Sequence, residues 1–255
     1  MARASLRSRL TIVISGLILA AGLVFSAVAY MEVRRALERA GGDRLHAVAT
    51  ELSNLLTQSV TAGIRDTQEL ATKPDLRAAL KATGNGPVAV PESMAAYVKR
   101  TKGSAAWLLR PDGSVVVAEP ADAKLTHAPH ASDEAVGPLV PVGDAIGFTL
   151  SAPLGGVGGE APPEGYVVVR RISSGSGGGA IERLIGAGTN FKIGNADGSV
   201  WTDLSKPVDA PRAQIGRGTI RFVDAAGEAR LGTAVAIAQT PWVVWLAMPR
   251  ATVLQ

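Results

Sequence analysis

The chain has 255 residues, enough for one large domain or two small ones with their own cores. Its net charge is +4, but the segment 1–40 holds six arginines against two glutamates and already accounts for that excess. The remainder is neutral, which argues against a nucleic-acid-binding surface, and the absence of cysteine excludes disulfides and thiolate metal sites.

The segment Leu10–Tyr30 contains no charged side chain and has arginines on both sides. A helix of that length measures about 31 Å, which matches the hydrocarbon core of a bilayer. We therefore predict a transmembrane helix over residues 10–30. The tail of residues 1–9 is too short to be a domain, so it is expected in the cytoplasm and everything after residue 30 is expected outside a bacterial inner membrane. One alternative stays open, because Ala27–Ala29 is an A-x-A pattern and cleavage after Ala29 would release a soluble exported protein.

Residues 31–73 are predicted to continue the same helix outside the membrane. Apolar side chains recur mostly at steps of three and four, which is typical of a helix with one buried stripe. The positions are Val33, Leu37, Ala40, Leu45, Val48, Leu52, Leu55, Val60 and Ile64. Lys73–Pro74 interrupts the helix, because proline is tolerated only in a first turn. Two short helices, Asp75–Lys81 and Glu92–Lys102, are expected to follow.

From residue 105 onward, short apolar runs separated by turn residues predict antiparallel strands. The expected strands are Ala105–Leu109, Val115–Ala118, Ala145–Ala152, Tyr166–Arg170, two within Phe191–Trp201, Thr219–Val223, Ala229–Ala238 and Trp242–Met248. The tetrapeptide Asp-Gly-Ser-Val stands at 112–115 and again at 197–200, each time between two predicted strands. We infer a duplicated sheet, in which position 112 corresponds to position 197, with a linker helix at Ala180–Ile185 between the copies. The fold class is therefore α+β, with the helices segregated from two antiparallel sheets.

At this point the chain resembles a family, the Cache sensor regions of bacterial receptors. The resemblance rests on the transmembrane helix, the long exit helix, the break Ala71–Leu80 and the closing run Thr240–Arg250, which in such receptors leads into a second transmembrane helix. The segments Gly165–Arg171, Leu184–Gly186 and Asn195–Leu204 are similar to the sensor part of membrane histidine kinases in particular.

This resemblance implies two PAS-like units, a membrane-distal one over residues 74–172 and a membrane-proximal one over residues 173–250. Residues 251–255 would begin the linker to a second transmembrane helix. It also implies a signal-sensing receptor that binds a small molecule, forms a homodimer through the long helix and belongs to a two-component system. The output could instead be a chemoreceptor, a cyclase or a phosphatase, since a sensor does not dictate its output.

Five side chains on or beside the predicted strands are candidates for ligand contact. Trp107 and Arg110 belong to the first unit, and Trp201, Asp203 and Arg221 belong to the second. Their aromatic rings and charges could provide stacking and charge recognition in a pocket between the sheet face and the helices over it. The alternative is that each tryptophan is a core residue or lies at the membrane surface.

Other motifs point away from catalysis, metals and cofactors. His46 lacks the acidic neighbour and the proline of a phosphoacceptor site, and His127 and His130 have no third fixed ligand. The glycine-rich stretches Gly155–Gly159 and Gly175–Gly179 lack the lysine of a phosphate loop, so we interpret them as linkers. We expect no catalytic residue, no metal and no cofactor in this chain, and we assign any catalysis to a separate C-terminal part.

Overall fold

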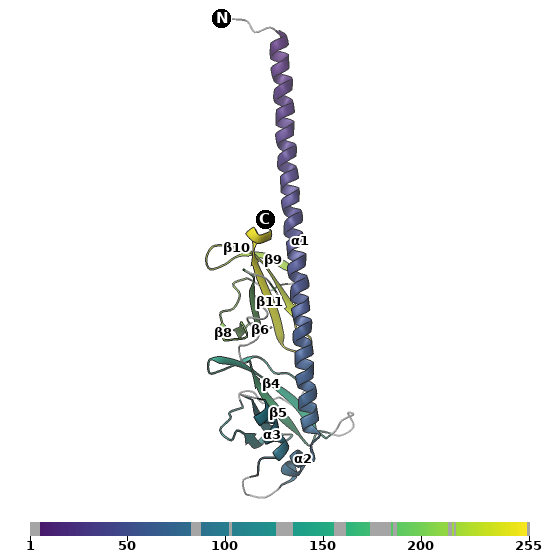
Figure 1. The fold of residues 1–255 in the computed structure, drawn as a ribbon, viewed down its shortest axis with the longest axis vertical. Coiled ribbons are helices and arrows are strands. Elements are labelled where there is room, and N and C mark those ends of the chain that lie inside the picture. The colour runs from purple at the N-terminus through teal and green to yellow at the C-terminus, as the bar shows by residue number, and fades with distance from the viewer. Residues whose placement is uncertain are drawn as a thin grey trace.

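The fold is a long helix with two antiparallel sheets stacked along one side of it, seen in a computed structural model (Figure 1). The structure describes residues 6–82, 88–101, 104–125, 135–155, 162–173, 185, 188–213, 216 and 218–253, with side chains in the first helix from Ile14 onward. The α+β fold class predicted from the sequence is confirmed.

The elements of secondary structure follow in chain order. The helices are α1 (Leu6–Ala71), α2 (Pro74–Lys81), α3 (Glu92–Arg100) and the terminal turn α5 (Arg250–Val253). The strands of the first sheet are β1 (Ala105–Leu109), β2 (Val115–Glu119), β3 (Val140–Val142), β4 (Ala145–Leu154) and β5 (Gly165–Ile172). The strands of the second sheet are β6 (Asn190–Asn195), β7 (Trp201–Thr202), β8 (Pro207–Val208), β9 (Thr219–Val223), β10 (Ala229–Ala236) and β11 (Trp242–Pro249).

Helix α1 is continuous over 66 residues and ends just before Pro74, which occupies the first turn of α2 as predicted. The buried stripe differs from the predicted one. Leu45, Leu52 and Val60 are buried, but Val33 and Leu37 are exposed, together with Ala40 and Leu55. The stripe that faces the sheets instead begins at Glu38 and includes Gly42 and Gly63, whose missing Cβ atoms leave room for Thr219 and Leu150.

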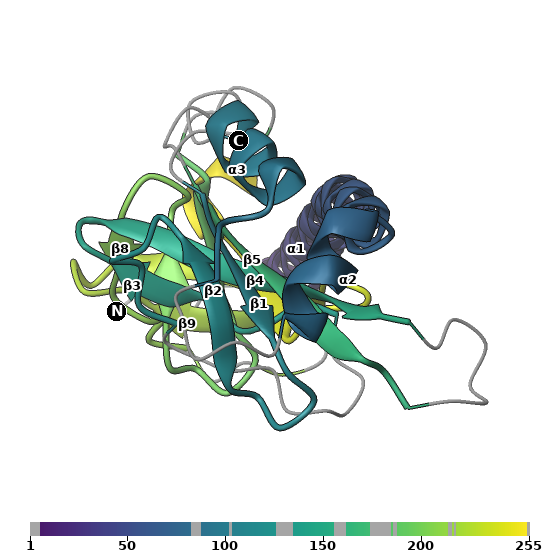
Figure 2. The ribbon, with the colours of Figure 1, turned by 90° about the horizontal axis from the view of Figure 1, so that it is seen from below.

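The two sheets share one strand order, apart from the additional edge strand β8 of the second sheet. The first runs β2-β1-β5-β4-β3 and the second runs β8-β7-β6-β11-β10-β9, so β1 corresponds to β6, β5 to β11 and β4 to β10. Helix α1 packs across β4 in one sheet and across β10 in the other, which are equivalent strands. Figure 2, seen along the helix, shows α1 lying to one side of both sheets.

The repeated Asp-Gly-Ser-Val segments adopt the same turn. In each, the aspartate accepts a hydrogen bond from the serine N–H two residues later, at 2.9 Å for Asp112 and 2.9 Å for Asp197. The glycine that follows has a φ of +83° at Gly113 and +80° at Gly198, a left-handed conformation that favours glycine. Strand order and turn geometry therefore both support the predicted duplication.

One apolar core joins the helix to both sheets. It contains Leu45, Leu52 and Val60 of α1, side chains of the first sheet such as Leu150, and side chains of the second sheet such as Val244. A second core at the far end packs α2 and α3 against the face of β1 and β5. Because α1 is part of both sheets' packing, a displacement of either sheet acts on the same helix.

The two sheets are also tied directly to each other through Asn195 at the end of β6. Its Oδ1 accepts from the Leu139 N–H at 2.8 Å and its Nδ2 donates to the Leu139 carbonyl at 3.0 Å. The Trp242 indole donates to the Gly137 carbonyl at 3.2 Å and meets Phe148 edge to face, with centroids 4.8 Å apart. These polar contacts are buried or half-buried and fix the sheets relative to one another.

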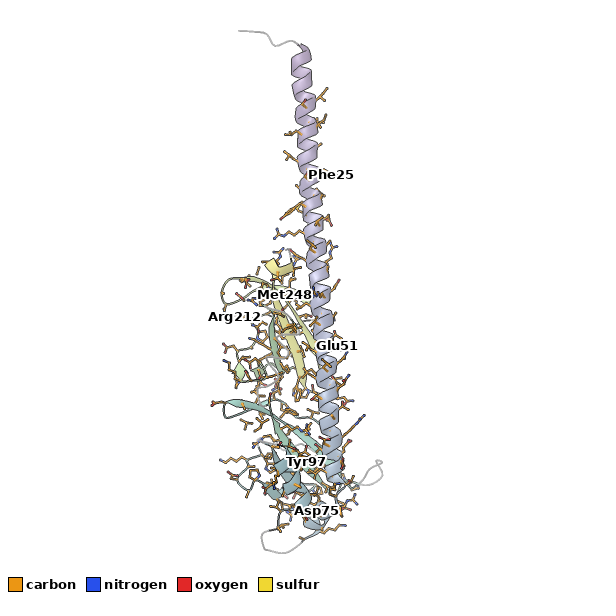
Figure 3. All side chains as sticks on the ribbon, in the orientation of Figure 1. Phe25, Glu51, Asp75, Tyr97, Arg212 and Met248 are labelled. Atoms are coloured by element: carbon orange, nitrogen blue, oxygen red, sulfur yellow. The ribbon has the colours of Figure 1, made fainter. Side chains whose placement is uncertain are left out.

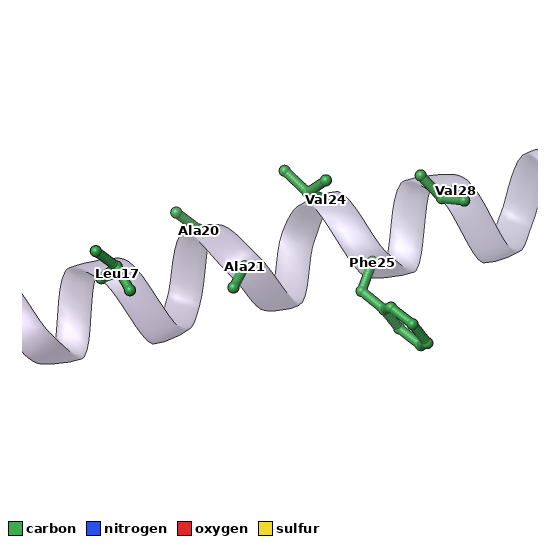
Figure 4. Close-up of a pocket in the computed structure, with 6 residues that line it drawn as sticks. All are labelled: Leu17, Ala20, Ala21, Val24, Phe25 and Val28. Atoms are coloured by element: carbon green, nitrogen blue, oxygen red, sulfur yellow. The ribbon is translucent and has the colours of Figure 1, made fainter.

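The first part of α1 extends beyond the sheets and packs against nothing else in the described part of the chain (Figure 1). Within the described residues it is the one helix long and apolar enough, by length and composition, to cross a membrane. Figure 4 shows six of its side chains, all apolar, and Phe25 among them is 77 % exposed. An uncovered apolar surface of this extent is costly in water and favourable in lipid.

Two strands were not predicted, and some predictions fall on residues that the structure does not describe. Strand β3 has three residues and contains Pro141, and β8 has two residues and begins at Pro207, so neither carries an alternating pattern. His127, His130, residues 156–159 and 175–179 and all but Ile185 of the predicted linker helix lie outside the described residues.

Candidate functional site

The five predicted contact residues do not converge on one place. Trp107 lies in β1, on the face of the first sheet away from the helices, where its side chain is fully buried. Its indole donates to the Ala123 carbonyl at 3.1 Å, and the Arg170 guanidinium lies 5.3 Å from the ring centroid. Arg110 is exposed at the turn after β1. Ligand contact by this pair stays a prediction.

Trp201 and Asp203 belong to the second sheet. Trp201 of β7 is buried over Gly194, whose missing Cβ would fall 2.3 Å from the ring. The Trp201 indole N–H is buried without a hydrogen-bond acceptor among the described residues. Asp203 accepts the backbone N–H groups of Ser205 and Lys206, at 2.8 Å and 2.9 Å, so its carboxylate organises the turn between β7 and β8. Its role in ligand contact also stays a prediction.

Arg221 belongs to a charged cluster at the end of the sheets that lies nearest the exposed part of α1. Its guanidinium is 2.7 Å from Glu38, a residue of α1 whose side chain is only 2 % exposed. Arg34, one turn earlier in α1, lies 3.5 Å from the same carboxylate. Arg250, the first residue after β11, donates to it through Nε at 2.7 Å and also through Nη2. We call these four side chains the Glu38 cluster.

The electrostatics of the Glu38 cluster keep the carboxylate charged. Burial raises the pKa of Glu38, but the hydrogen bond from Arg250 and the charges of Arg221, Arg250 and Arg34 leave this pKa below its ordinary value. The cluster joins three places distant in the sequence: helix α1, strand β9 and the end of β11. It therefore connects the point where the chain leaves the apolar segment with the point where the second sheet ends.

A cavity of about 310 Å³ lies on the face of the second sheet away from α1. Its floor includes Trp245 and Ala247 of β11 and Phe222 of β9, and the segment at residues 209–212 covers it. Figure 3 shows Arg212 on the side of the sheet opposite α1. Two further cations line it, Lys192 of β6 and Arg230 of β10. We call this space the proximal cavity.

The charges around the proximal cavity are unevenly compensated. Arg230 is paired with Asp224 at 2.6 Å and with Glu228 at 2.9 Å. Lys192 donates to the Asp209 carbonyl at 2.7 Å, and burial lowers the pKa of this lysine, an effect that the Asp209 carboxylate opposes only in part. The Arg212 side chain is exposed at the rim. A desolvated lysine beside an apolar floor suits a ligand that carries negative charge.

A second cavity, of about 260 Å³, lies between the end of α1 and α3 in the first unit. Asp66, Lys73 and Arg100 are among its lining residues, so charged side chains of both signs border it. Beside it, Arg171 donates to Asp66 at 2.9 Å and to the Tyr97 hydroxyl at 3.1 Å. Burial lowers the pKa of Arg171, but the hydrogen bonds that it donates to Tyr97 and Asp66 leave this pKa raised, so Arg171 acts as a permanent charge that ties β5 to α1 and α3.

Glu38 and Lys192 are the functional candidates that the sequence patterns missed. Glu38 reads as an ordinary polar position on a helix, because two of its three arginines, Arg221 and Arg250, stand far from it in the sequence. Lys192 could have been found from the duplication, since the alignment that pairs position 112 with position 197 also pairs Trp107 with Lys192. The equivalence of β1 and β6 bears this out.

No protein-family model and no curated protein matches this chain. Solved structures do match over most of its length. The ligand-binding domain of the Pseudomonas aeruginosa PAO1 amino acid chemoreceptor PctC, in complex with GABA, aligns with a TM-score of 0.53 and 12 % identity, covering 82 % of this chain and 99 % of that one.

Two further matches are domains of other bacterial proteins. The sensor domain of the Vibrio cholerae histidine kinase DctB has a TM-score of 0.51 at 10 % identity and covers 83 % of this chain and 98 % of its own. The periplasmic domain of RsbU from Chlamydia trachomatis has a TM-score of 0.53 at 10 % identity and covers 88 % and 98 %. The chain therefore has the fold of these sensor domains, and the predicted resemblance to Cache sensor regions is confirmed at the level of the fold.

Proposed function

We propose that this chain is the extracytoplasmic signal-sensing part of an inner-membrane receptor, that it binds a small molecule, and that it passes a conformational signal across the membrane to a histidine kinase. The observation that carries the proposal is the Glu38 cluster. It ties the helix that leaves the apolar segment to the end of β11, where a second span would begin. A displacement of the second sheet is thus transmitted to both connections with the membrane.

The small-molecule part of the proposal is supported by the matched sensor folds. PctC was solved with GABA, and the ligand-binding domain of Mlp24, with a TM-score of 0.54 and 14 % identity, was solved with asparagine. Binding alone would transmit nothing, because a ligand shifts an equilibrium only when its affinity for the two conformations differs. In two such conformations, the contacts of α1 with the sheets and the contacts of Asn195 between the sheets would be arranged differently.

We also propose that two copies associate through α1. Val33 and Leu37 lie just beyond the apolar segment, and 59 % and 43 % of their surface is exposed. A second apolar stripe on a helix whose first stripe is already covered favours a helix partner. Leu37→Cys should form a covalent dimer on oxidation in membranes, whereas Ser205→Cys, in an exposed turn of the second sheet, should stay monomeric.

Fractionation tests the membrane location. The uncleaved anchor predicts a full-length chain that is extracted only with detergent. Loss of the segment 1–29 and recovery in the soluble exported fraction would instead establish the alternative, an exported binding protein released after Ala29.

A hybrid receptor tests the signalling. Residues 1–253 would be joined to the second span, relay and catalytic core of a characterised histidine kinase. Glu38→Gln should change the basal autophosphorylation of this hybrid, because it weakens the tie between α1 and β11. Glu51→Gln is the matched control, since Glu51 is exposed on the same helix. Equal output from wild type and Glu38→Gln would contradict the proposal.

A further inference from the structure

The proximal cavity differs from the five predicted contact positions in both location and chemistry. None of those residues lines it. It lies between the outer face of the second sheet and the segment at residues 209–212, and its volume of about 310 Å³ falls at the lower end of the range for small-molecule sites. Its floor and two of its cations come from β6, β9, β10 and β11, and the rest of its wall comes from residues 209–212 and the turn at residues 224–226. Strand positions hold side chains more firmly than loops do.

Small residues in the sheet create the room for this cavity. Gly232 of β10 lies beneath Trp245, and a Cβ at this glycine would fall 2.5 Å from the indole ring. The ring therefore lies flat on the strand and packs against Phe222, with centroids 5.7 Å apart. Ala247 continues the same face beside Trp245. The result is a shallow apolar floor with cations at its edges.

The cations at those edges differ in their partners, because Arg230 is in ion pairs while Lys192 and Arg212 are in none among the described residues. Both carboxylates near Arg230 are used by it, and Asp224 in addition accepts the backbone N–H groups of Ala226 and Glu228. The Lys192 ammonium has one hydrogen bond to the Asp209 carbonyl and is attracted by the Asp209 carboxylate, but no ion pair of Lys192 or Arg212 occurs within the described part of the chain. A ligand carboxylate placed between Lys192 and Arg212 would give both cations a direct partner.

We propose that the proximal cavity binds a small carboxylate whose apolar part lies on Phe222, Trp245 and Ala247 and whose negative charge is held by Lys192 and Arg212. This proposal rests on the proposed function, for which it names a site and a ligand class. Direct recognition of a charged group accounts for the lysine at a position where the equivalent strand of the first sheet carries Trp107.

The position of the cavity also connects it with the Glu38 cluster. Phe222 and Arg221 are neighbours on β9, and successive side chains of a strand point to opposite faces of its sheet. Phe222 therefore meets the ligand on one face, while Arg221 meets Glu38 at 2.7 Å on the other. Strand β11 also connects the cavity with the Glu38 cluster, over a longer path. Trp245 and Ala247 of this strand form the cavity floor, and Arg250 follows the end of the strand.

Calorimetry on the full chain in lipid nanodiscs tests the proposal, with benzoate as the probe and benzamide as its neutral counterpart. Benzoate should bind the wild type and benzamide should bind at least tenfold more weakly. Lys192→Met should weaken benzoate binding at least tenfold, and Ala210→Trp, which fills the cavity from its exposed cover, should abolish it. The control Lys206→Met changes an exposed lysine of the same sheet that does not line the cavity, and it should bind as the wild type does.

Three results would overturn the proposal: no benzoate binding by the wild type, equal binding of benzamide, or equal affinity in Lys192→Met and Lys206→Met. Circular dichroism of each variant establishes that it is folded, and the two independent variants guard against loss by misfolding. Failure here is distinguishable from failure of the proposed function, because the basal output of the hybrid receptor with Glu38→Gln is measured without any ligand.

Discussion

The two sheets have the same strand order but differ at one equivalent position. In the first sheet this position is Trp107, which fills the face away from the helices and is fixed by the Ala123 carbonyl. In the second sheet it is Lys192, which borders a cavity. The two sheets thus share a topology, while the equivalent side chain belongs to a packed face in the first sheet and to a charged wall in the second. Equal folds in this molecule do not mean equal functions.

The largest effect should come from breaking the contact between the sheets at Asn195. Asn195→Ala leaves the Leu139 N–H and carbonyl buried without partners, which should lower the free energy of unfolding by about 2 to 4 kcal/mol. Denaturant unfolding of the full chain in detergent measures this change. Asn190→Ala, at the exposed start of the same strand, is the control, and a loss as large in the control would remove the special role of Asn195.

The second-largest effect should come from overpacking the floor of the proximal cavity. Gly232→Ala forces the Trp245 ring off the strand, and overpacking of this kind costs about 1 to 3 kcal/mol. Thermal unfolding and the fluorescence spectrum of the tryptophans would show it. Gly216→Ala has nothing within 4 Å of the added Cβ and should be nearly neutral. A neutral Gly232→Ala would mean that the floor tolerates a raised indole ring.

Breaking the Glu38 cluster should act locally. Arg34 and Arg221 are partly exposed, so solvent screens their attraction to Glu38, and a glutamine can still accept a hydrogen bond from Arg250. Glu38→Gln should therefore lower global stability less than either of the two preceding substitutions. Amide hydrogen exchange should nevertheless become faster in α5 and β9. Unchanged exchange there would show that apolar packing alone holds these elements to α1.

The stabilisation that the Glu38 cluster provides should depend on pH with a definite sign. The folded-state pKa of Glu38 is lowered, so its contribution is complete above the ordinary glutamate pKa and is lost as pH falls through the folded value. The protection factors of the α5 amides, which correct for the pH dependence of intrinsic exchange, should therefore be constant from neutral pH down to the ordinary glutamate pKa and should fall only below it. A fall in protection near neutral pH would contradict this account.

The smallest effect should be found at the repeated turns. The pKa of Asp112 is lowered by the hydroxyl and the N–H of Ser114, and that of Asp197 by the N–H and the hydroxyl of Ser199. Asp112→Asn and Asp197→Asn should each lower the melting temperature slightly and by the same amount at neutral pH, and the difference from wild type should vanish in acid. Clearly unequal changes would show that the duplicated hairpins have diverged in their contribution to folding.

Much of this fold is predictable from the sequence because its signals are local. Pro74 marks the end of α1, and Asp-Gly-Ser-Val marks both turns, since proline and left-handed glycine restrict the backbone wherever they stand. The stripe of α1 was predicted only in part. Val33 and Leu37 have the apolar character of covered residues, but the sheets meet the adjacent face, which begins at Glu38.

The candidate site was harder to predict because its residues meet only in the folded chain. Glu38 and Arg250 are 212 positions apart, and no spacing rule links them. Ligand contact by the predicted tryptophans and arginines stays a prediction. In the fold, Trp107 and Trp201 are buried, and Arg221 forms an ion pair with Glu38. The one signal that could have indicated Lys192 was the offset of the duplication, applied residue by residue.

The central claim is that the second sheet and the exit helix move as one unit through the Glu38 cluster. Because the chain has no cysteine, Glu51→Cys on α1 and Val223→Cys at the exposed end of β9 can be spin-labelled without further changes. Pulsed electron paramagnetic resonance on the full chain in nanodiscs then measures the distance between the labels. We predict one narrow distribution, which broadens or shifts when Glu38→Gln is added. An identical distribution with and without Glu38→Gln would contradict the claim.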